Sequence, residues 1–461
     1  MSNTATQRRL YQLQAHLTSS PTKATVVATT IRKKLLSGIR VVELATVIAA
    51  PCACALLCDH GAEVIKVEDP RNPDIARSWG NGDRSDLTAD PTLYSAIGGG
   101  GSAFTNINRG KKAIALNPTT KRGNEILIQL IGTADIFVTN VRQKSLIKMG
   151  LDYDTLRLIY PKLIFGQLSA WGRHGPMKDD PGYDFGAFWA HTGVQEIIRS
   201  GDDAPMPRFP GGVGDYTTGH QLFGGIMAAL YQREREGIGQ LVDAALIRAG
   251  LWFLSHSISQ GAGGTLWANA DDGAGLATGG VRETTELGKR RTSITDAPYK
   301  CKDGRWIQLM GLEVKRHLPA TLQALNLTLN DISNCDGKID WRKATSIVDS
   351  IFIQKTSQEW GSILTKNNVW WKRINRFDEM LNDEQANASG AFVEIDGLRH
   401  KLVGNPIIMS ESNHHPSTTA PRFGQHTNDI LKSIGVSAYE MNILVKNGTI
   451  SEGIIHRTTK E

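Results

Sequence analysis

Asp215 is the side chain whose surroundings in the sequence are most suggestive of chemistry. It follows Gly212, Val213 and Gly214, a flexible stretch that permits a sharp turn, and it precedes an expected helix over residues 217–236. A carboxylate there lies near the positive end of the helix dipole. It can serve as an N-cap that accepts backbone N–H groups, or as a nucleophile. The local sequence leaves both roles open.

The cysteines offer no comparable site. Cys52, Cys54 and Cys58 form a C-x-C-x-x-x-C cluster without a nearby His pair or a second C-x-x-C, so we expect no metal site. They are interpreted as small residues that pack a helix against a sheet. The odd total of five cysteines argues against a disulfide framework and fits a reducing compartment.

The formal net charge of +6 arises in the first forty residues. That segment holds seven Lys or Arg residues and no Asp or Glu, and the remainder has 45 basic against 46 acidic residues. A folded body without a basic excess does not favour nucleic-acid binding. No run of eighteen apolar residues is present, so no membrane span is expected.

Residues 1–37 have the composition of a mitochondrial transit peptide. They are rich in Ser and Thr, lack acids, and place Leu10, Leu13 and Leu17 on one helical face beside Arg8 and Arg9. This predicts a location in the mitochondrial matrix. The alternative is a disordered basic tail on a cytoplasmic protein.

Strand and helix patterns alternate from Gly38 onward. Strands are predicted over residues 39–44, 64–67, 113–116, 135–138 and 163–168, and helices over residues 51–58, 120–131 and 217–236. Such alternation predicts an α/β fold with a mainly parallel sheet whose ligands bind at the carboxyl ends of the strands. No G-x-G-x-x-G follows the first strand, which disfavours a dinucleotide-dependent dehydrogenase.

Composition also suggests the domain organisation. We expect a large Rossmann-like domain over residues 38–260, a Gly-rich loop or linker over 261–289, a smaller α/β domain over 290–403, and a return to the large domain over 404–461. A hairpin is predicted around Asp303 and Gly304.

Several motifs occur in a set order across residues 38–435. They are GIRVVEL at 38–44, AAP at 49–51, GAEVIKVE at 61–68, NRGKK at 108–112, ADIFVTN at 134–140, MGL at 149–151, PGYD at 181–184, GDY at 214–216, GIGQ at 237–240 and APRFGQHT at 420–427. Together they resemble the class III CoA-transferase family, also called CaiB/BaiF. The resemblance implies a large Rossmann-like domain, a smaller domain and an interlocked homodimer.

The resemblance also implies roles for individual residues. Asp215 matches the catalytic aspartate, and Tyr183 and Asp184 are active-site neighbours. The implied CoA-binding residues are Val47, Ile48, Ala49, Asn140, Val141 and Lys148, with Ile48 and Ala49 in the loop that flanks the thioester. Arg142, Lys66 and Lys111 are weaker candidates, because a solvated surface position is the commoner fate of a single Lys or Arg.

Tyr183 separates two chemistries of the family. Members that racemise 2-methylacyl-CoA carry a histidine at this position, since moving a proton between two faces of a carbon needs a group that titrates near neutral pH. A tyrosine with an ordinary pKa of about 10 is a poor substitute. His220 is interpreted as an ordinary helix residue. Transfer is therefore favoured over racemisation, and a catalytically dead CoA-binding protein is the third alternative.

The resemblance implies acyl-CoA and small carboxylic acids as partners, with no cofactor beyond CoA as a substrate. Ile48 and Asp69 replace a glutamine and an arginine of the oxalate-specific members, so oxalate and formate specificity is not expected. A mitochondrial location would suit small dicarboxylates.

Overall fold

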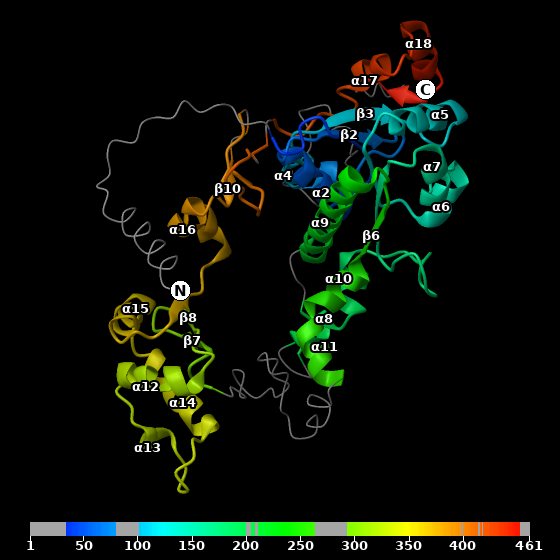
Figure 1. The fold of residues 1–461 in the computed structure, drawn as a ribbon. Helices are drawn as coiled ribbons and strands as arrows, with labels where there is room; N and C mark the ends of the chain where they lie inside the picture. The colour runs from blue at the N-terminus through cyan, green and yellow to red at the C-terminus, as the bar shows by residue number, and fades with distance from the viewer. Residues whose placement is uncertain are drawn as a thin grey trace, which may run out of the picture.

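The structure is a computed structural model, and it describes residues 34–79, 101–199, 204–207, 211–262 and 293–451, apart from 397, 399, 414 and 417. Most of the predicted transit peptide and of the 261–289 linker lies outside the described residues. Figure 1 shows the central sheet with its helices and, apart from it, a second group of elements built by residues beyond 293.

A seven-stranded sheet forms the centre of the fold. Its strand order is β12-β3-β2-β1-β4-β5-β6, and every pair is parallel except β12 with β3. The strands are β1 (Arg40–Leu44), β2 (Glu63–Glu68), β3 (Lys112–Leu116), β4 (Ile136–Thr139), β5 (Ile164–Ser169), β6 (Leu241–Ala245) and β12 (Ile450–Ser451). This confirms the expected α/β fold, and the order 3-2-1-4-5-6 is that of a doubly wound Rossmann-like sheet.

Helices cover both faces of the sheet because successive residues of each strand point to opposite sides. Val42 belongs to the core beneath α5 (Lys121–Ile131), whereas Val41 belongs to the core beneath α2 (Ala49–Asp59) and α9 (Val213–Glu236). Both valines are fully buried. Continuous apolar strands of this kind are typical of parallel sheets covered on both faces.

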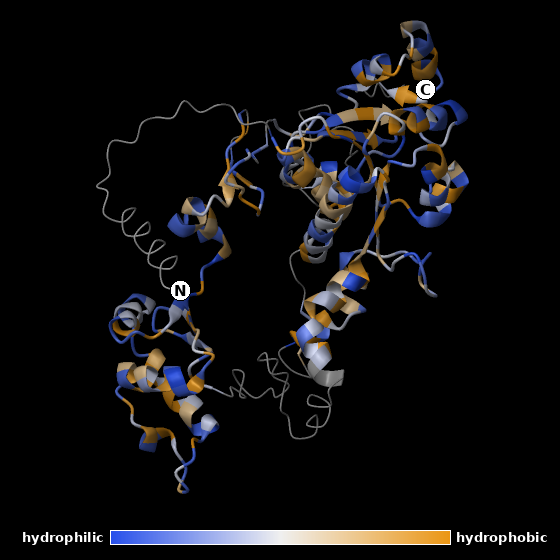
Figure 2. Cartoon of the chain, in the orientation of Figure 1, coloured by the Kyte–Doolittle hydropathy of each residue, from blue (hydrophilic) through white to orange (hydrophobic). Residues whose placement is uncertain are grey.

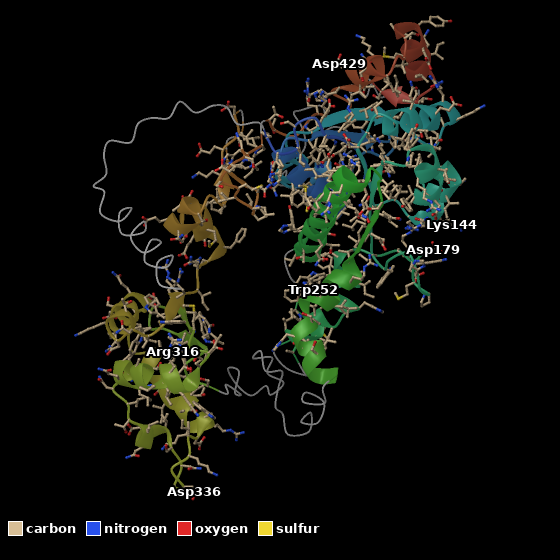
Figure 3. All side chains as sticks on the ribbon, viewed as in Figure 1. Lys144, Asp179, Trp252, Arg316, Asp336 and Asp429 are labelled. Atoms are coloured by element: carbon tan, nitrogen blue, oxygen red, sulfur yellow. The ribbon has the colours of Figure 1, made fainter. Side chains whose placement is uncertain are left out.

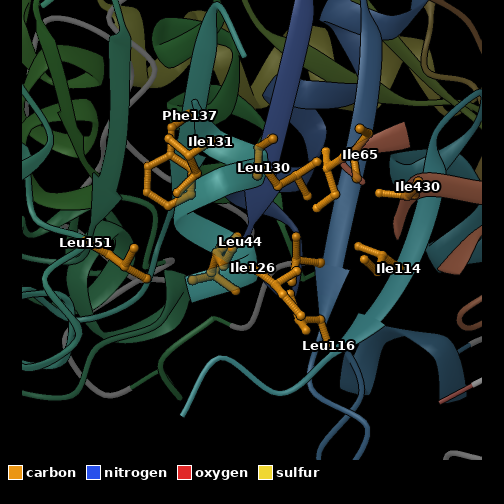
Figure 4. Close-up of a cluster of buried hydrophobic side chains, with 14 of the residues drawn as sticks. Leu44, Ile65, Ile114, Leu116, Ile126, Leu130, Ile131, Phe137, Leu151 and Ile430 are labelled. Atoms are coloured by element: carbon orange, nitrogen blue, oxygen red, sulfur yellow. The ribbon is translucent and has the colours of Figure 1, made fainter. Parts of the chain in front are cut away.

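The first of these cores also unites distant parts of the chain. Figure 4 shows Ile126 and Leu130 of α5 beside Ile65 and Ile114 of the sheet, with Ile430 of α17 (Thr427–Ser433) in the same cluster. The C-terminal elements α17, α18 (Ala438–Lys446) and β12 therefore pack with the central sheet.

Residues 294–369 build a separate core around a three-stranded antiparallel sheet. Its strands are β7 (Pro298–Lys300), β8 (Trp306–Leu309) and β9 (Trp371–Arg373), and its helices are α12 (Val314–Leu325), α13 (Leu329–Ile332), α14 (Trp341–Phe352) and α15 (Ser357–Lys366). The predicted hairpin around Asp303 is present as β7 and β8. The domain boundaries near 260, 290 and 404 stay predictions.

Further elements complete the described parts of the chain. They are η1 (Ile75–Ser78), α4 (Ser102–Asn108), α6 (Gln143–Met149), α7 (Tyr153–Ile159), η2 (Phe185–Ala190), α8 (Val194–Ile197), α10 (Leu246–Phe253), α11 (Ser255–Ala262), η3 (Phe377–Asn382), α16 (Glu384–Ala388), β10 (Phe392–Val393) and β11 (Leu402–Val403). Among the described residues, no helix combines the length and apolar character needed to cross a membrane.

Candidate active site

The site begins where the strand order reverses, between β1 and β4. The chain leaves β1 and β4 through two neighbouring loops at the carboxyl ends of these strands, which is where doubly wound sheets bind their ligands. Asn140 joins the loops: its Nδ2 donates to the Thr46 carbonyl at 2.8 Å, and its Oδ1 accepts from the Thr46 N–H at 3.1 Å. Its amide thus fixes the relative position of the loops.

A cleft of about 420 Å³ opens over these loops. Its wall contains Thr46, Val47, Ala49, Asn140, Val141, Arg142, Gln143, Ser145, Gln167, Leu168, Ser169, Ala170, Trp171, Gly172, Arg173, Lys178, Asp180, Pro181, Gly182, Tyr183, Asp215 and Leu246. Residues from the loops after β1 and β4, from β5 and from α9 therefore converge on one space, although they are far apart in the sequence.

A second cavity, of about 770 Å³, adjoins the first. Thr46, Val141 and Ser145 line both cavities, so the two spaces meet across the β1 and β4 loops. The far side of the second cavity includes Lys121 of α5 and Lys148 of α6. An extended ligand could lie along the pair, with one end at Asp215 and the other near Lys148.

Asp215 lies inside the first turn of α9, not before it. The helix begins at Val213, and its N-cap is Gly212, whose φ of 94° is left-handed and therefore suits glycine. The predicted helix start near Thr217 was four residues too late, and the N-cap role considered for Asp215 is wrong. Asp215 is nevertheless largely buried, with 8% of its surface exposed, and its side chain borders the cleft.

The side chain of Asp184 lies beneath the start of this helix. Its Oδ2 accepts a hydrogen bond from the Gly212 N–H at 2.9 Å. Gly214 lets this carboxylate approach, because a Cβ at Gly214 would lie 2.1 Å from Asp184 Oδ1. Asp184 is 3% exposed, so its charge acts on the start of α9 without much screening by water.

These surroundings govern the protonation of Asp215. Burial, and secondarily the negative charge of Asp184, raise the pKa of Asp215 from 3.8 to about 7. The pKa is raised although Asp215 stands in the first turn of α9, near the positive end of the helix dipole. Burial also raises the pKa of Asp184, against the hydrogen bond from Gly212 that lowers it.

The residues predicted from the sequence occupy several places around the cleft. Those that line the first cavity are Val47, Ala49, Asn140, Val141, Tyr183 and Asp215, and those that line the second are Val141 and Lys148. Ile48 lines neither, and it packs beside a small core that contains Cys52 and Phe104. Asp184 lies behind the wall.

The three weaker cationic candidates, Arg142, Lys66 and Lys111, do not all lie in the cleft. Arg142 lines the first cavity. Lys66 and Lys111 are buried and paired with Glu43, so the expectation of solvated surface positions is wrong for both. The sequence carried a signal for Lys66, because it stands in the middle of an apolar parallel strand, where both faces are covered.

Further cleft residues were missed from the sequence. Thr46 and Ser145 border both cavities, and Arg173 and Lys178 add positive charge to the first. Cys52, Cys54 and Cys58 are buried in α2. Within the described residues, no group of three or more His, Cys, Asp or Glu side chains is placed to hold a metal ion.

A doubly wound sheet with an elongated cleft at its switch point and a buried carboxylate in the cleft wall defines an α/β enzyme that acts on an extended ligand. The profile of CoA-transferase family III matches residues 36–427. The chain therefore belongs to this family and is a CoA-transferase.

Curated relatives cover nearly the whole chain. The (R)-2-hydroxy-4-methylpentanoate CoA-transferase of Clostridioides difficile is 33% identical over 88% of this chain and 97% of its own length. The cinnamoyl-CoA:phenyllactate CoA-transferase of Clostridium sporogenes is 30% identical over 90% of this chain and 97% of its own. The succinate–glutarate CoA-transferase of Agrobacterium fabrum is 32% identical over 87% and 96%.

Solved structures agree on the fold. A CaiB/BaiF family protein from Brucella suis superposes with a TM-score of 0.67 at 24% identity, covering 87% of this chain and all of that chain. Rv3272 from Mycobacterium tuberculosis gives a TM-score of 0.70 at 22% identity with the same coverage.

Proposed function

We propose that the protein moves CoA from an acyl-CoA donor to a carboxylic acid, and that Asp215 carries the transferred group. The observation that supports this most is the buried Asp215 carboxylate in the wall of the cleft at the sheet's switch point. Membership of a CoA-transferase family supplies the reaction class.

The proposed reaction is a sequence of acyl transfers. The Asp215 carboxylate attacks the donor thioester carbonyl, which forms a mixed anhydride and releases the CoA thiolate. The thiolate attacks the aspartyl carbonyl of the anhydride, which leaves an aspartyl-CoA thioester and frees the donor acid. The acceptor carboxylate then attacks this thioester, and the released thiolate attacks the acceptor's carbonyl to give the new acyl-CoA and free Asp215.

The raised pKa of Asp215, about 7, fits this role. A more basic carboxylate is a stronger nucleophile than one with an ordinary pKa near 3.9, provided that the pH is high enough to ionise it. The anhydride conserves the activation of the thioester, so the steps need no metal and no redox cofactor.

We place CoA along the two adjoining cavities. The thioester end lies beside Asp215 in the first cavity, and the nucleotide end extends into the second, toward Lys148. Lys121 and Lys148 line the second cavity and can attract the phosphates, whereas Arg142, Arg173 and Lys178 line the first cavity and can attract the carboxylate of the acid.

The acid pair is a separate question. Two relatives are named for 2-hydroxy acids with apolar side chains, and a third is named for dicarboxylates. The substrate class of this chain therefore requires a screen of acyl-CoA donors against both kinds of acid.

Racemisation is the alternative within the family. Tyr183 lines the cleft with Asp215 and is 71% exposed. Proton exchange with a substrate carbon near neutral pH ordinarily uses groups such as histidine, and this position holds a tyrosine. Transfer is the better supported chemistry.

Two substitutions at Asp215 test the proposal. Asp215→Ala and the nearly isosteric Asp215→Asn should reduce transfer by at least about 10³-fold, since both remove the nucleophile. The affinity for CoA, measured by calorimetry, should stay close to that of the wild-type protein because most of the ligand is held elsewhere. An Asn variant that transfers CoA at the wild-type rate would exclude this role for Asp215.

A further inference from the structure

A group of buried charges surrounds residues 45–51, here called the 45–51 turn, which run from the end of β1 into the first residues of α2. Lys66 Nζ lies 3.1 Å from Glu43 Oε1 and 2.9 Å from Asp74 Oδ2. Lys111 Nζ lies 2.6 Å from Glu43 Oε2. All four side chains are buried. We call Glu43, Lys66, Asp74 and Lys111 the charge group; its two positive and two negative charges cancel.

The charge group also bonds the backbone of the turn at three points. Lys66 Nζ donates to the Ala45 carbonyl at 2.7 Å, and Lys111 Nζ donates to the Pro51 carbonyl at 2.9 Å. Asp74 Oδ1 accepts from the Val47 N–H at 3.0 Å. The two ends and the centre of the turn are therefore each held by a different member.

The backbone at the centre of the turn is in an unusual conformation. Val47 has a φ of 70°, in the left-handed region that β-branched residues rarely adopt. Such a conformation persists only where the surrounding structure imposes it. The bond to Asp74 and the two flanking lysine bonds supply that constraint, and Val47 lines the cleft beside Asp215.

Glu43 and Lys66 remain ionised despite their burial. Burial alone would raise the pKa of Glu43, but Lys111 and Lys66 outweigh it and lower the pKa. Burial likewise opposes the charged form of Lys66, whereas Asp74 and Glu43 raise its pKa overall. Replacing one member therefore leaves its partner buried without full compensation.

We propose that the charge group consists of positioning residues, which hold the 45–51 turn in the shape that receives the thioester end of CoA next to Asp215. This inference rests on the proposed function for its ligand. The group acts through the backbone of the turn: Glu43, Lys66 and Lys111 line neither cavity, whereas Thr46, Val47 and Ala49 face the first cavity. Asp74 is buried but also borders the second cavity.

Asp74→Asn is the first test. Asparagine keeps an oxygen for the Val47 N–H but loses the charge that pairs with Lys66, so the side chain that anchors the centre of the turn is held less firmly. Because a displacement of about 1 Å at a positioning element can cost on the order of 10²-fold, kcat/KM for the acyl-CoA should fall by about that factor. Hydrogen exchange of the amides at residues 45–50 should also accelerate.

A double-mutant cycle with Val47→Gly separates positioning from general destabilisation. Glycine adopts a positive φ without strain, so in the Asp74→Asn background it should recover about tenfold in kcat/KM, a coupling expected only between interacting sites. Asn326→Gly is the matched control. Asn326 also has a positive φ, 54°, but it ends α12, and it should show no coupling to Asp74.

The exchange measurement on the wild-type protein keeps the inference testable if Asp74→Asn does not fold. A protected Val47 amide is expected, and rapid exchange there would refute the inference. Wild-type kcat/KM in Asp74→Asn, or failure of Val47→Gly to restore activity, would refute it as well. A wild-type protein that transfers no CoA would overturn the proposed function instead, while the exchange result would still decide whether the charge group holds the turn.

Discussion

At the scale of residues, the site depends on two carboxylates at the start of one helix. Asp184 accepts the Gly212 N–H, and Asp215 stands three residues further on in the first turn of α9. The charge of Asp184 disfavours ionisation of Asp215, and burial disfavours ionisation of both carboxylates. The consequence is a nucleophile whose charge depends on pH near neutrality.

This arrangement predicts an acid limb in the pH profile. Transfer requires the ionised Asp215, whose pKa is raised to about 7, so kcat/KM should increase tenfold per pH unit below that pH and level off above it. Asp184→Asn removes the like charge while keeping an acceptor for Gly212, so the limb should move to lower pH. A profile measured between about pH 5 and 9 checks both statements.

Asp179→Asn is the control for this prediction. Asp179, labelled in Figure 3, is an exposed residue on the same connection to η2, and its charge is screened by solvent. Its replacement should leave the limb in place. An Asp184→Asn profile that superposes on the wild-type curve would show that the two carboxylates are not coupled.

Asp215 is identifiable from the sequence, but its raised pKa is not. The GDY motif identifies Asp215, and the glycines that precede it in the sequence predict a tight turn. The pKa shift arises from burial and from Asp184, which is 31 positions earlier in the chain. Contacts of this kind depend on how η2 and α9 pack, and no local pattern encodes them.

At the scale of elements, the contact between α2 and α9 places Asp215 beside the turn after β1. Gly219 allows this contact, because a Cβ there would lie 2.3 Å from the Ala49 carbonyl oxygen and 2.4 Å from Cys52 Sγ. The small residues of α2, including the three cysteines, let the two helices approach closely.

Two glycines of α9 should therefore respond oppositely to alanine. Gly219→Ala must push α2 away from α9, which should lower the free energy of unfolding by about 1–3 kcal/mol and reduce transfer. Gly224→Ala should instead raise stability by up to about 1 kcal/mol, since nothing lies within 4 Å of its added Cβ. Urea unfolding of both variants tests this, and equal effects would contradict the packing described.

The elements themselves were largely predictable where the pattern was strong. The strands β1 to β5 and the helix α5 fall close to their predicted ranges, because apolar runs and a capping Thr120 define them locally. The start of α9 and the strand β12 were missed. Gly212 and Gly214 obscure the helix start, and β12 has only two residues, paired with β3 through tertiary packing.

At the scale of the whole molecule, the strand order places the loops that line the cleft side by side. A separate feature, an exposed apolar stretch on α10, predicts that the protein associates with a second copy of itself. Leu251, Trp252 and Phe253 on α10 are 42%, 73% and 59% exposed, and Figure 3 shows Trp252 at the surface of this helix. Figure 2 shows apolar segments on α10 next to polar ones. Consecutive exposed large apolar residues are typical of protein–protein contacts, so we propose that this stretch contacts a second copy in a homodimer.

Sedimentation of a charged variant tests the dimer. Trp252→Glu should shift the wild-type dimer toward monomer, because a carboxylate is costly to bury at an interface. Leu158→Glu is the control: Leu158 is 80% exposed but lies on α7, away from α10. A wild-type protein that sediments as a monomer at micromolar concentration would contradict the proposal.

The mitochondrial location and the role of residues 1–37 also stay predictions.

The most direct test of the account is to trap the covalent intermediate on Asp215. The protein is incubated with a donor acyl-CoA and hydroxylamine, which attacks the activated aspartyl carbonyl of either the anhydride or the thioester, and the peptides are then analysed by mass spectrometry. We predict a hydroxamate on Asp215, formed only when the donor is present and absent from the Asp215→Asn variant. Continuing turnover with an unmodified Asp215, or with a hydroxamate on a different residue, would contradict the account.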